Sequence, residues 1–167
     1  MKIRKADDSD FPAILPVYAH ARQQMQQTGN PNQWGKNKPS PETLREDIRE
    51  GNLYLLEEDE KIVGVFAFII GEDPTYRYIE GSWKNNRPYG TVHRLASSGQ
   101  AHGIWEGCFH FCRSLLPNLR IDTHADNRIM QRLVEKSGFE RCGIIYLEDK
   151  SPRIAYQYAP EQDMPAE

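Results

Sequence analysis

Residues 91–104, TVHRLASSGQAHGI, combine residue types that could bind an anion. Residues 91–96 are predicted to form a buried strand, and Ser97-Ser98-Gly99 supplies small residues suited to a turn. Apolar side chains then recur at the offsets of a buried helical stripe: Ala101, Ile104, Trp105, Cys108, Cys112 and Leu115. Because the first N–H groups of a helix lack internal partners and carry the positive end of its dipole, this turn could hold a diphosphate.

The three cysteines do not suggest a metal site. Cys108 and Cys112 lie four residues apart on the predicted helix, and Cys142 lies far along the chain, so the set lacks metal-ligand spacing. We expect no metal, reduced thiols that pack in the core, and a cytoplasmic protein. The 167 residues, 38% hydrophobic and 27% charged, are typical of a soluble globular protein.

Net charge and hydropathy indicate which classes of binding partner are not expected. The net charge of -3 gives no reason to expect nucleic acid. No apolar run approaches the length needed to cross a bilayer, and the first ten residues lack a signal-peptide core, so we expect no membrane partner. A homodimer stays open, because symmetric dimers are the commonest soluble oligomers.

Periodicity and turn residues predict the elements that must position the turn. The predicted strands are residues 2–6, 53–57, 61–70, 91–96, 119–123, 139–147 and 153–158. One predicted helix begins at Ser40-Pro41-Glu42, with Ser40 as its cap and Pro41 at its first position. The other predicted helices follow Asp7 to Asp10, the turn at Gly99, and Asn127. We expect a single domain over residues 1–160 and a polar tail over residues 161–167.

Two irregular segments carry aromatic residues. Residues 28–39 form a loop rich in Gly, Pro and Asn, in which Trp34 could pack the loop onto the domain or wall a pocket. Residues 71–89 hold Tyr76, Tyr78, Trp83 and Tyr89 among polar residues. These side chains either fold back on the body or line a pocket or an oligomer contact.

The order of the elements resembles that of the GCN5-related N-acetyltransferases (GNAT), over nearly the whole chain. The family's cofactor motif opens with Gln or Arg and places a Gly three residues on, as do Gln100 and Gly103; Trp105 departs from the small final residue of the motif. The second signature, an Asn followed by Gly-Phe, matches Asn127 and Gly138-Phe139. The resemblance implies an α/β (α+β) acyl-CoA N-acyltransferase fold, with a mixed, mostly antiparallel sheet of about six or seven strands and about four helices.

The resemblance implies acetyl-CoA as co-substrate. The residues it assigns to cofactor binding are Leu95, Ala96, Ser97, Gln100, Ala101, His102, Gly103, Ile104 and Asn127. The backbone of residues 95–97 would pair with the pantetheine arm, and the N–H groups of residues 100–104 would hold the pyrophosphate. Gly103 would let the chain approach the phosphates closely. Asn127 would contact the cofactor, cap its helix, or do both.

The implied reaction is attack of an amine on a thioester. His93 is the first candidate base, since some arylalkylamine acetyltransferases of the family have a His at the matching place and an imidazole suits the role. Glu80 is the second candidate base and His124 is the third. The family's usual acid is a Tyr at the position occupied here by Val134, so Tyr146 is the candidate acid, with solvent as the alternative.

The sequence predicts only the general chemical class of the acceptor. The acceptor-binding candidates are Trp34, Tyr76, Tyr78, Trp83 and His124. Aromatic side chains could hold an apolar or cationic acceptor, and Glu80 could pair with an ammonium. We expect acetyl transfer to a primary amine of a small molecule or peptide; a non-catalytic acyl-CoA sensor or an interaction domain with the same fold remains the alternative.

Overall fold

The computed structural model describes residues 1–160, and the tail expected over residues 161–167 lies outside the described residues. The strands are β1 (Lys2–Lys5), β2 (Leu53–Glu58), β3 (Lys61–Ile70), β4 (Glu80–Gly81), β5 (Gly90–Ser97), β6 (Leu119–Thr123), β7 (Glu140–Tyr146) and β8 (Pro152–Tyr158). The α-helices are α1 (Phe11–Gln27), α2 (Pro41–Arg49), α3 (Ile104–Leu115) and α4 (Arg128–Lys136), with short 3-10 helices η1 (Asp8–Asp10) and η2 (Pro74–Tyr76).

The strands form a mixed sheet in the order β1-β2-β3-β5-β6-β8-β7-β4. β5 pairs with β6 in parallel, while β1 with β2, β2 with β3, β6 with β8, β7 with β8, and β4 with β7 are antiparallel. The predicted α/β fold with a mostly antiparallel sheet is therefore confirmed. The chain divides into two compact units: unit 1 comprises Met1–Phe68 and His93–Phe111, and unit 2 comprises Ile69–Val92 and the described residues from Cys112 onward.

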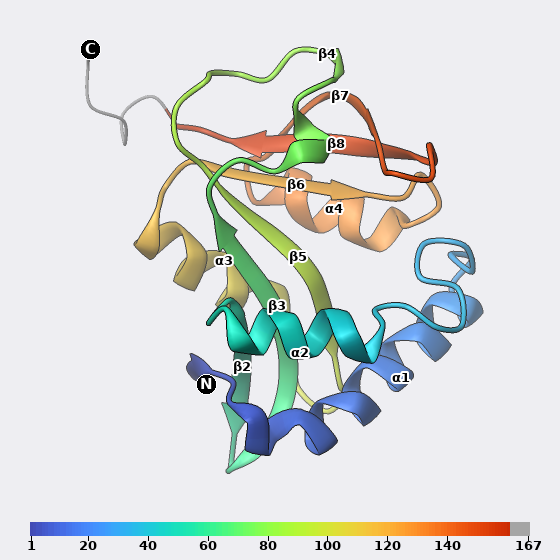
Figure 1. The fold of residues 1–167 in the computed structure, drawn as a ribbon, viewed down its shortest axis with the longest axis vertical. Helices are drawn as coiled ribbons and strands as arrows, with labels where there is room; N and C mark the ends of the chain where they lie inside the picture. The colour runs from blue at the N-terminus through green and yellow to red at the C-terminus, as the bar shows by residue number, and fades with distance from the viewer. Residues whose placement is uncertain (161–167) are drawn as a thin grey trace. The chain divides into compact units, whose positions relative to one another are not determined.

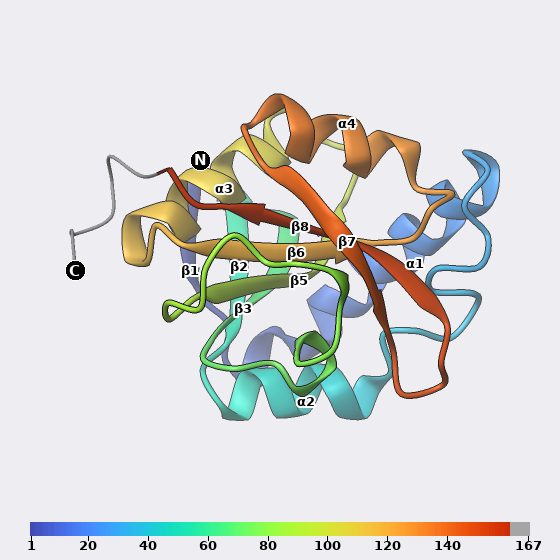
Figure 2. The ribbon, with the colours of Figure 1, turned by 90° about the horizontal axis from the view of Figure 1, so that it is seen from above.

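Unit 1 is built around the β2–β3 hairpin. The apolar run of β3 is buried from Val63 to Phe68, as expected for a strand covered on both faces. Within this unit, α2 and the first turns of α3 lie on opposite faces of β2 and β3 (Figures 1 and 2). The helix α2 begins as predicted, because the Ser40 hydroxyl accepts the Thr43 N–H at 3.1 Å and Pro41 occupies the first helical position.

Unit 2 places the aromatic segment and α4 on opposite faces of β6, β8 and β7 (Figure 2). Tyr76 and Tyr89 are buried, and the indole N–H of Trp83 donates to the carbonyl of Tyr76 at 2.9 Å. The guanidinium of Arg120 lies 4.0 Å from the Trp83 ring centre and 3.8 Å from that of Tyr89. Most of this segment therefore folds back on the body, although Tyr78 remains 64% exposed.

The sheet has eight strands, whereas the sequence predicted about six or seven. The strand that the sequence did not indicate is β4. This two-residue strand pairs Glu80 with Ile144 and Gly81 with Gly143. A side chain at Gly81 would collide with the Cys142 carbonyl, and one at Gly143 would collide with that of Glu80. The pairing thus depends on two facing glycines, which no hydrophobic periodicity reveals.

The helix α3 starts later than its apolar stripe predicts. Gly99 and Gly103 have φ angles of +80° and +77°, a left-handed conformation that a right-handed helix cannot contain. The helix therefore begins at Ile104 and leaves Ala101 in the preceding turn. Leu115 is 48% exposed, so the buried stripe also ends earlier than predicted.

Candidate functional site

The β5–α3 turn, defined as residues 98–103, has the backbone of an anion site. Gly103 precedes the first helical residue, Ile104, and has no side chain with which to cap the helix. The N–H of Gly107 donates to the carbonyl of Gly103 at 2.9 Å, so the helical ladder starts with this bond and does not use the amides ahead of Gly107. An anion at this helix start would meet backbone N–H groups and the positive end of the dipole.

Two serine hydroxyls shape the first half of the turn. The N–H of Gly99 donates to the Ser97 hydroxyl at 3.0 Å, and the N–H of Gln100 donates to the Ser98 hydroxyl at 3.2 Å. The Gln100 amide, expected to face a pyrophosphate, is thus directed at a hydroxyl of its own turn. The amides that can face a ligand lie further along, from Ala101 to Ile104.

Trp105, which departs from the family motif, is a core residue of unit 1. Its side chain is 3% exposed, and its ring stacks on that of Phe109 with centroids 5.7 Å apart and planes 8° apart. The bulk of the indole is therefore inside the protein. The departure at this position leaves the glycine backbone of the turn unchanged.

Ahead of the turn, β5 is kinked at Arg94, whose φ is +54°. The Arg94 guanidinium donates to both carboxylate oxygens of Asp47 on α2, each at 2.8 Å, and the Tyr18 hydroxyl donates to the Arg94 carbonyl at 2.7 Å. Burial raises the pKa of Tyr18 well above its ordinary value, so the hydroxyl keeps its proton. The neighbouring His93, the candidate base, is partly exposed.

The Arg94–Asp47 pair together with the Tyr18 hydroxyl, called the clamp below, was not predicted from the sequence. The signal that could have found it is a pair of consecutive polar residues, His93 and Arg94, inside a strand predicted to be buried, since a bulge interrupts the regular order of side chains along a strand. A second signal is Asp47 beside Ile48 on the apolar stripe of α2.

In unit 2 the structure brings together two residues predicted separately. The Tyr146 hydroxyl donates to the Glu80 carboxylate at 2.5 Å, across the β4–β7 pair. This hydrogen bond, with a smaller effect of burial, raises the pKa of Tyr146 above its ordinary value. Tyr78 lies beside the pair, with its ring centre 6.4 Å from that of Tyr146. Tyr78, Glu80 and Tyr146 thus form an exposed cluster of two phenols and an acid.

The turn between β6 and α4 holds two further candidates. The Nδ1 atom of His124 accepts the Asp126 N–H at 3.0 Å, and the side-chain oxygen of Asn127 accepts the Met130 N–H at 3.0 Å. The predicted capping role of Asn127 is confirmed. Val134, which stands where the family's usual acidic Tyr would be, is fully buried.

The remaining aromatic candidates pack against other residues of their own unit. Tyr76 is 2% exposed and its hydroxyl donates to Asp122 at 2.6 Å, which places it in the core of unit 2 and leaves little surface for an acceptor. Trp83 is held between Tyr76 and Arg120, as described above. In unit 1, Trp34 packs on the core, with its ring centre 5.7 Å from that of Tyr18.

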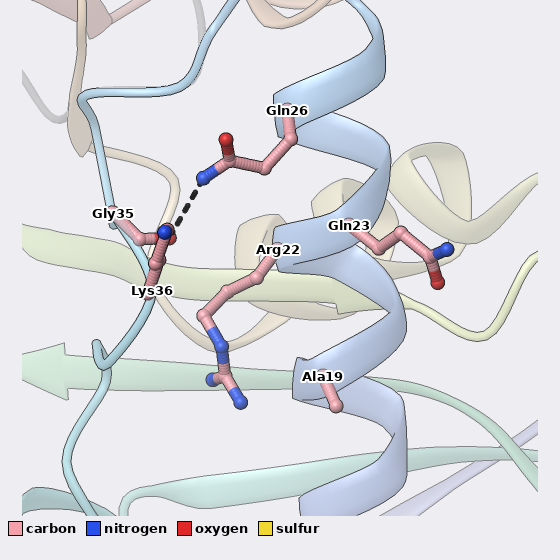
Figure 3. Close-up of a pocket in the computed structure, with 6 residues that line it drawn as sticks. All are labelled: Ala19, Arg22, Gln23, Gln26, Gly35 and Lys36. Atoms are coloured by element: carbon pink, nitrogen blue, oxygen red, sulfur yellow. Dashed lines mark hydrogen bonds between the residues drawn. The ribbon is translucent and has the colours of Figure 1, made fainter.

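A shallow hollow of about 340 Å³ lies elsewhere in unit 1, between α1 and the loop that follows it. In Figure 3 the side chains of Arg22 and Gln26 reach from α1 toward this loop, while Gln23 points to the other side of the helix. Gln26 donates to the Gly35 carbonyl at 3.3 Å and Arg22 to the Lys38 carbonyl at 3.2 Å. These bonds fasten the loop to the helix, and the hollow contains none of the residues predicted for the site.

Within residues 1–160, no group of three or more His, Cys, Asp or Glu side chains could hold a metal ion. Cys108 and Cys112 are buried thiols, and Cys142 is partly buried. Among the same residues, no helix is both long and apolar enough to cross a membrane.

Comparison with known proteins gives a consistent result. No family model matches the chain, and no curated protein matches it. Among solved structures, an acetyltransferase of the GNAT family from Streptococcus agalactiae is 30% identical, with 96% of this chain and 95% of that chain covered and a TM-score of 0.86. A GNAT-family acetyltransferase from Listeria monocytogenes is 16% identical, with 93% and 92% coverage and a TM-score of 0.70. A Salmonella typhimurium protein solved with its cofactor acetyl-CoA is also 16% identical, with 99% and 97% coverage and a TM-score of 0.64.

Proposed function

Because the chain belongs to the GCN5-related N-acetyltransferase (GNAT) family, we propose that it transfers an acetyl group from acetyl-CoA to a primary amine of a small molecule or peptide. The observation that carries the proposal is the β5–α3 turn, where Gly99 and Gly103 adopt left-handed φ angles directly ahead of a helix. In the reaction a C–N bond forms and the C–S bond of the thioester breaks. The amine loses a proton, and the departing thiolate gains one.

The residues of the turn fit a diphosphate. A methyl group added at Gly103 would have no atom closer than the Glu106 carboxylate at 3.9 Å, so the start of α3 is open to a ligand. We assign the diphosphate to the backbone of Ala101, His102, Gly103 and Ile104, and the pantetheine arm to the backbone of residues 95–97. Asn127 is proposed as a further cofactor contact. Acetyl-CoA itself supplies the activated thioester.

For the proton transfers we propose His93 as base, with Glu80 as the second candidate, and Tyr146 as acid. The Tyr146 hydroxyl donates to the Glu80 carboxylate, so the candidate acid and the second candidate base share one hydrogen bond. Val134 is buried and apolar, so α4 offers no acid at the family's usual position.

For the acceptor we propose a cationic amine that meets Tyr78, Glu80 and Tyr146. The exposed ring of Tyr78, the partly exposed ring of Tyr146 and a carboxylate are groups that attract an ammonium. His124 and Trp34 remain proposed acceptor contacts, whereas Tyr76 and Trp83 act by holding the aromatic segment in place. We also propose that residues 1–160 work as one cytoplasmic acetyltransferase domain without metal, nucleic acid or membrane, with a homodimer left open.

The test is release of CoA thiol from acetyl-CoA in the presence of a broad panel of amines. We expect release with at least one cationic amine, and a fall in kcat of about a hundredfold in Tyr146→Phe with an unchanged unfolding temperature, as for loss of a general acid. Because the pKa of Tyr146 is raised, the phenol keeps its proton as the pH rises, and kcat should not fall from its deprotonation below about pH 10. Tyr78→Phe is the matched control, since it removes the hydroxyl of the neighbouring Tyr and keeps the ring that is proposed to contact the acceptor.

The alternative is a non-catalytic acyl-CoA sensor or interaction domain, which the buried Val134 favours. It predicts that CoA binds but that no amine in the panel releases thiol. Turnover that disappears in Tyr146→Phe and His93→Ala would exclude this alternative.

A further inference from the structure

The imidazole of His20 lies directly against the β5–α3 turn. His20 is in α1, and both segments belong to unit 1. A Cβ placed on Gly99 would lie 2.6 Å from Nε2 of His20, 3.2 Å from Cε1 and 3.5 Å from Cδ2. Of these ring atoms, Nε2 is therefore the nearest to the Cβ position of Gly99. Gly99 suits this position for two reasons: its φ is +80°, and a side chain there would require the His20 ring to shift.

The polar atoms of the ring are not used by the fold. Among residues 1–160, no hydrogen bond or ion pair involves the His20 side chain. The residue is partly exposed, so its ring nitrogens are open to solvent or to a ligand. An imidazole that has no such partner among these residues and whose nitrogen adjoins an anion-binding turn is placed to donate to a ligand there.

We propose that His20 is a further ligand of the acyl donor, donating a hydrogen bond from Nε2 to its diphosphate beside Gly99. The inference rests on the proposed function, because it takes acetyl-CoA as the occupant of the turn. The backbone amides of residues 101–104 approach the diphosphate from the start of α3, whereas His20 approaches from α1. The glycine at position 99 leaves the space through which the ring reaches the ligand.

The competing explanation is that His20 only packs on Gly99. Replacement by Phe separates the two, because Phe keeps an aromatic ring of similar shape and removes the nitrogens. Replacement by Gln keeps a donor at about the reach of Nε2. Gln24→Ala is the matched control, since Gln24 is exposed one turn further along the same helix.

The experiment is calorimetric titration of each variant with CoA and with 3′-dephospho-CoA. We expect His20→Phe to weaken CoA binding about tenfold, as for one hydrogen bond to a charged group, while His20→Gln stays within about threefold of the wild type and Gln24→Ala is unchanged. The same tenfold loss is expected with 3′-dephospho-CoA. Thermal unfolding should show equal midpoints for all four proteins, so that the loss reports on the ligand.

Three outcomes overturn the proposal in distinguishable ways. Equal affinity of wild type and His20→Phe assigns His20 to packing and leaves the proposed function standing. A loss seen with CoA but absent with 3′-dephospho-CoA moves the contact to the 3′-phosphate and contradicts the diphosphate assignment. A wild-type protein that binds neither compound overturns the proposed function and, with it, this inference.

Discussion

Two strand-to-helix turns in this molecule look alike in outline and differ in how their helices begin. Asn127 precedes α4, and its side chain accepts the Met130 N–H at 3.0 Å. Gly103 precedes α3 and has no side chain. The turn before α4 is further fixed by the bond from the Asp126 N–H to His124. The turn before α3 instead has two glycines with positive φ.

This difference between the two helix starts indicates a different role for each turn. A helix start capped by its own side chain has less need of an external partner, while one preceded by glycine leaves room for an anion to act as the cap. In unit 1 the strand ahead of the α3 turn is held by the Arg94–Asp47 pair and by the hydrogen bond from the Tyr18 hydroxyl.

The largest expected effect comes from giving the α3 turn a cap of its own. In Gly103→Asp, a carboxylate would occupy the start of α3 and repel the diphosphate, so CoA binding should weaken at least about a hundredfold. A non-glycine residue at a φ of +77° should also cost about 1 kcal/mol of unfolding free energy. Calorimetry with CoA and urea denaturation measure the two effects.

Gly29→Asp is the matched control for this change. Gly29 also has a positive φ, of +84°, and has open space around it. It should also lose stability, and its CoA binding should be unaltered. Equal CoA affinity in Gly103→Asp and Gly29→Asp would mean that the α3 turn does not bind the anion.

Next in size is removal of the charge that holds the kink in β5. In Asp47→Asn, the largely buried Arg94 guanidinium loses its ionic partner, and we expect a loss of about 2 kcal/mol of unfolding free energy. Glu46→Gln, exposed on the same helix, should change stability by less than about 0.5 kcal/mol. Urea denaturation measures the unfolding free energy of both variants. Similar values for the two would show that the clamp contributes little to stability.

A smaller effect is expected at the other turn. Asn127→Ala should lower the unfolding free energy by about 1 kcal/mol, because α4 loses its cap. Asn127→Asp keeps an accepting oxygen and should restore stability. If Asn127 also contacts the cofactor, Asn127→Asp will be stable yet bind CoA more weakly than the wild type. Unchanged CoA affinity in that variant would restrict Asn127 to capping.

The smallest effect concerns Glu106, in the first turn of α3. Its carboxylate is 3.9 Å from where a side chain at Gly103 would begin, so it opposes an anion at the turn. Glu106→Gln should therefore tighten CoA binding about threefold at low salt, and the gain should shrink as salt is added. Weaker binding in this variant would indicate that Glu106 assists the ligand.

Residues with a clear period or cap could be predicted from the sequence. The run of β3, the Ser40 start of α2 and the Asn127 cap of α4 were found because each depends on neighbours in the chain. The motif at Gln100 and Gly103 located the α3 turn, but the apolar stripe that begins at Ala101 placed the helix start too early. The left-handed glycines, which set that start, are visible only in the backbone conformation.

Residues that act through distant partners could not be predicted. Asp47 and Arg94 are 47 positions apart, and Glu80 and Tyr146 are 66 apart, so no local pattern links them. The short strand β4 depends on the facing glycines Gly81 and Gly143. The aromatic segment offered both a packing and a pocket explanation, and burial assigned Tyr76 to packing while leaving Tyr78 exposed.

The most direct test of the central claim is calorimetric titration of the wild-type protein with CoA. The claim is that the glycine turn ahead of α3 binds the diphosphate of an acyl donor. It predicts saturable binding of one CoA per chain with a micromolar Kd, lost in Gly103→Asp and kept in Gly29→Asp. Absence of binding up to millimolar CoA, or binding that survives Gly103→Asp, would contradict it.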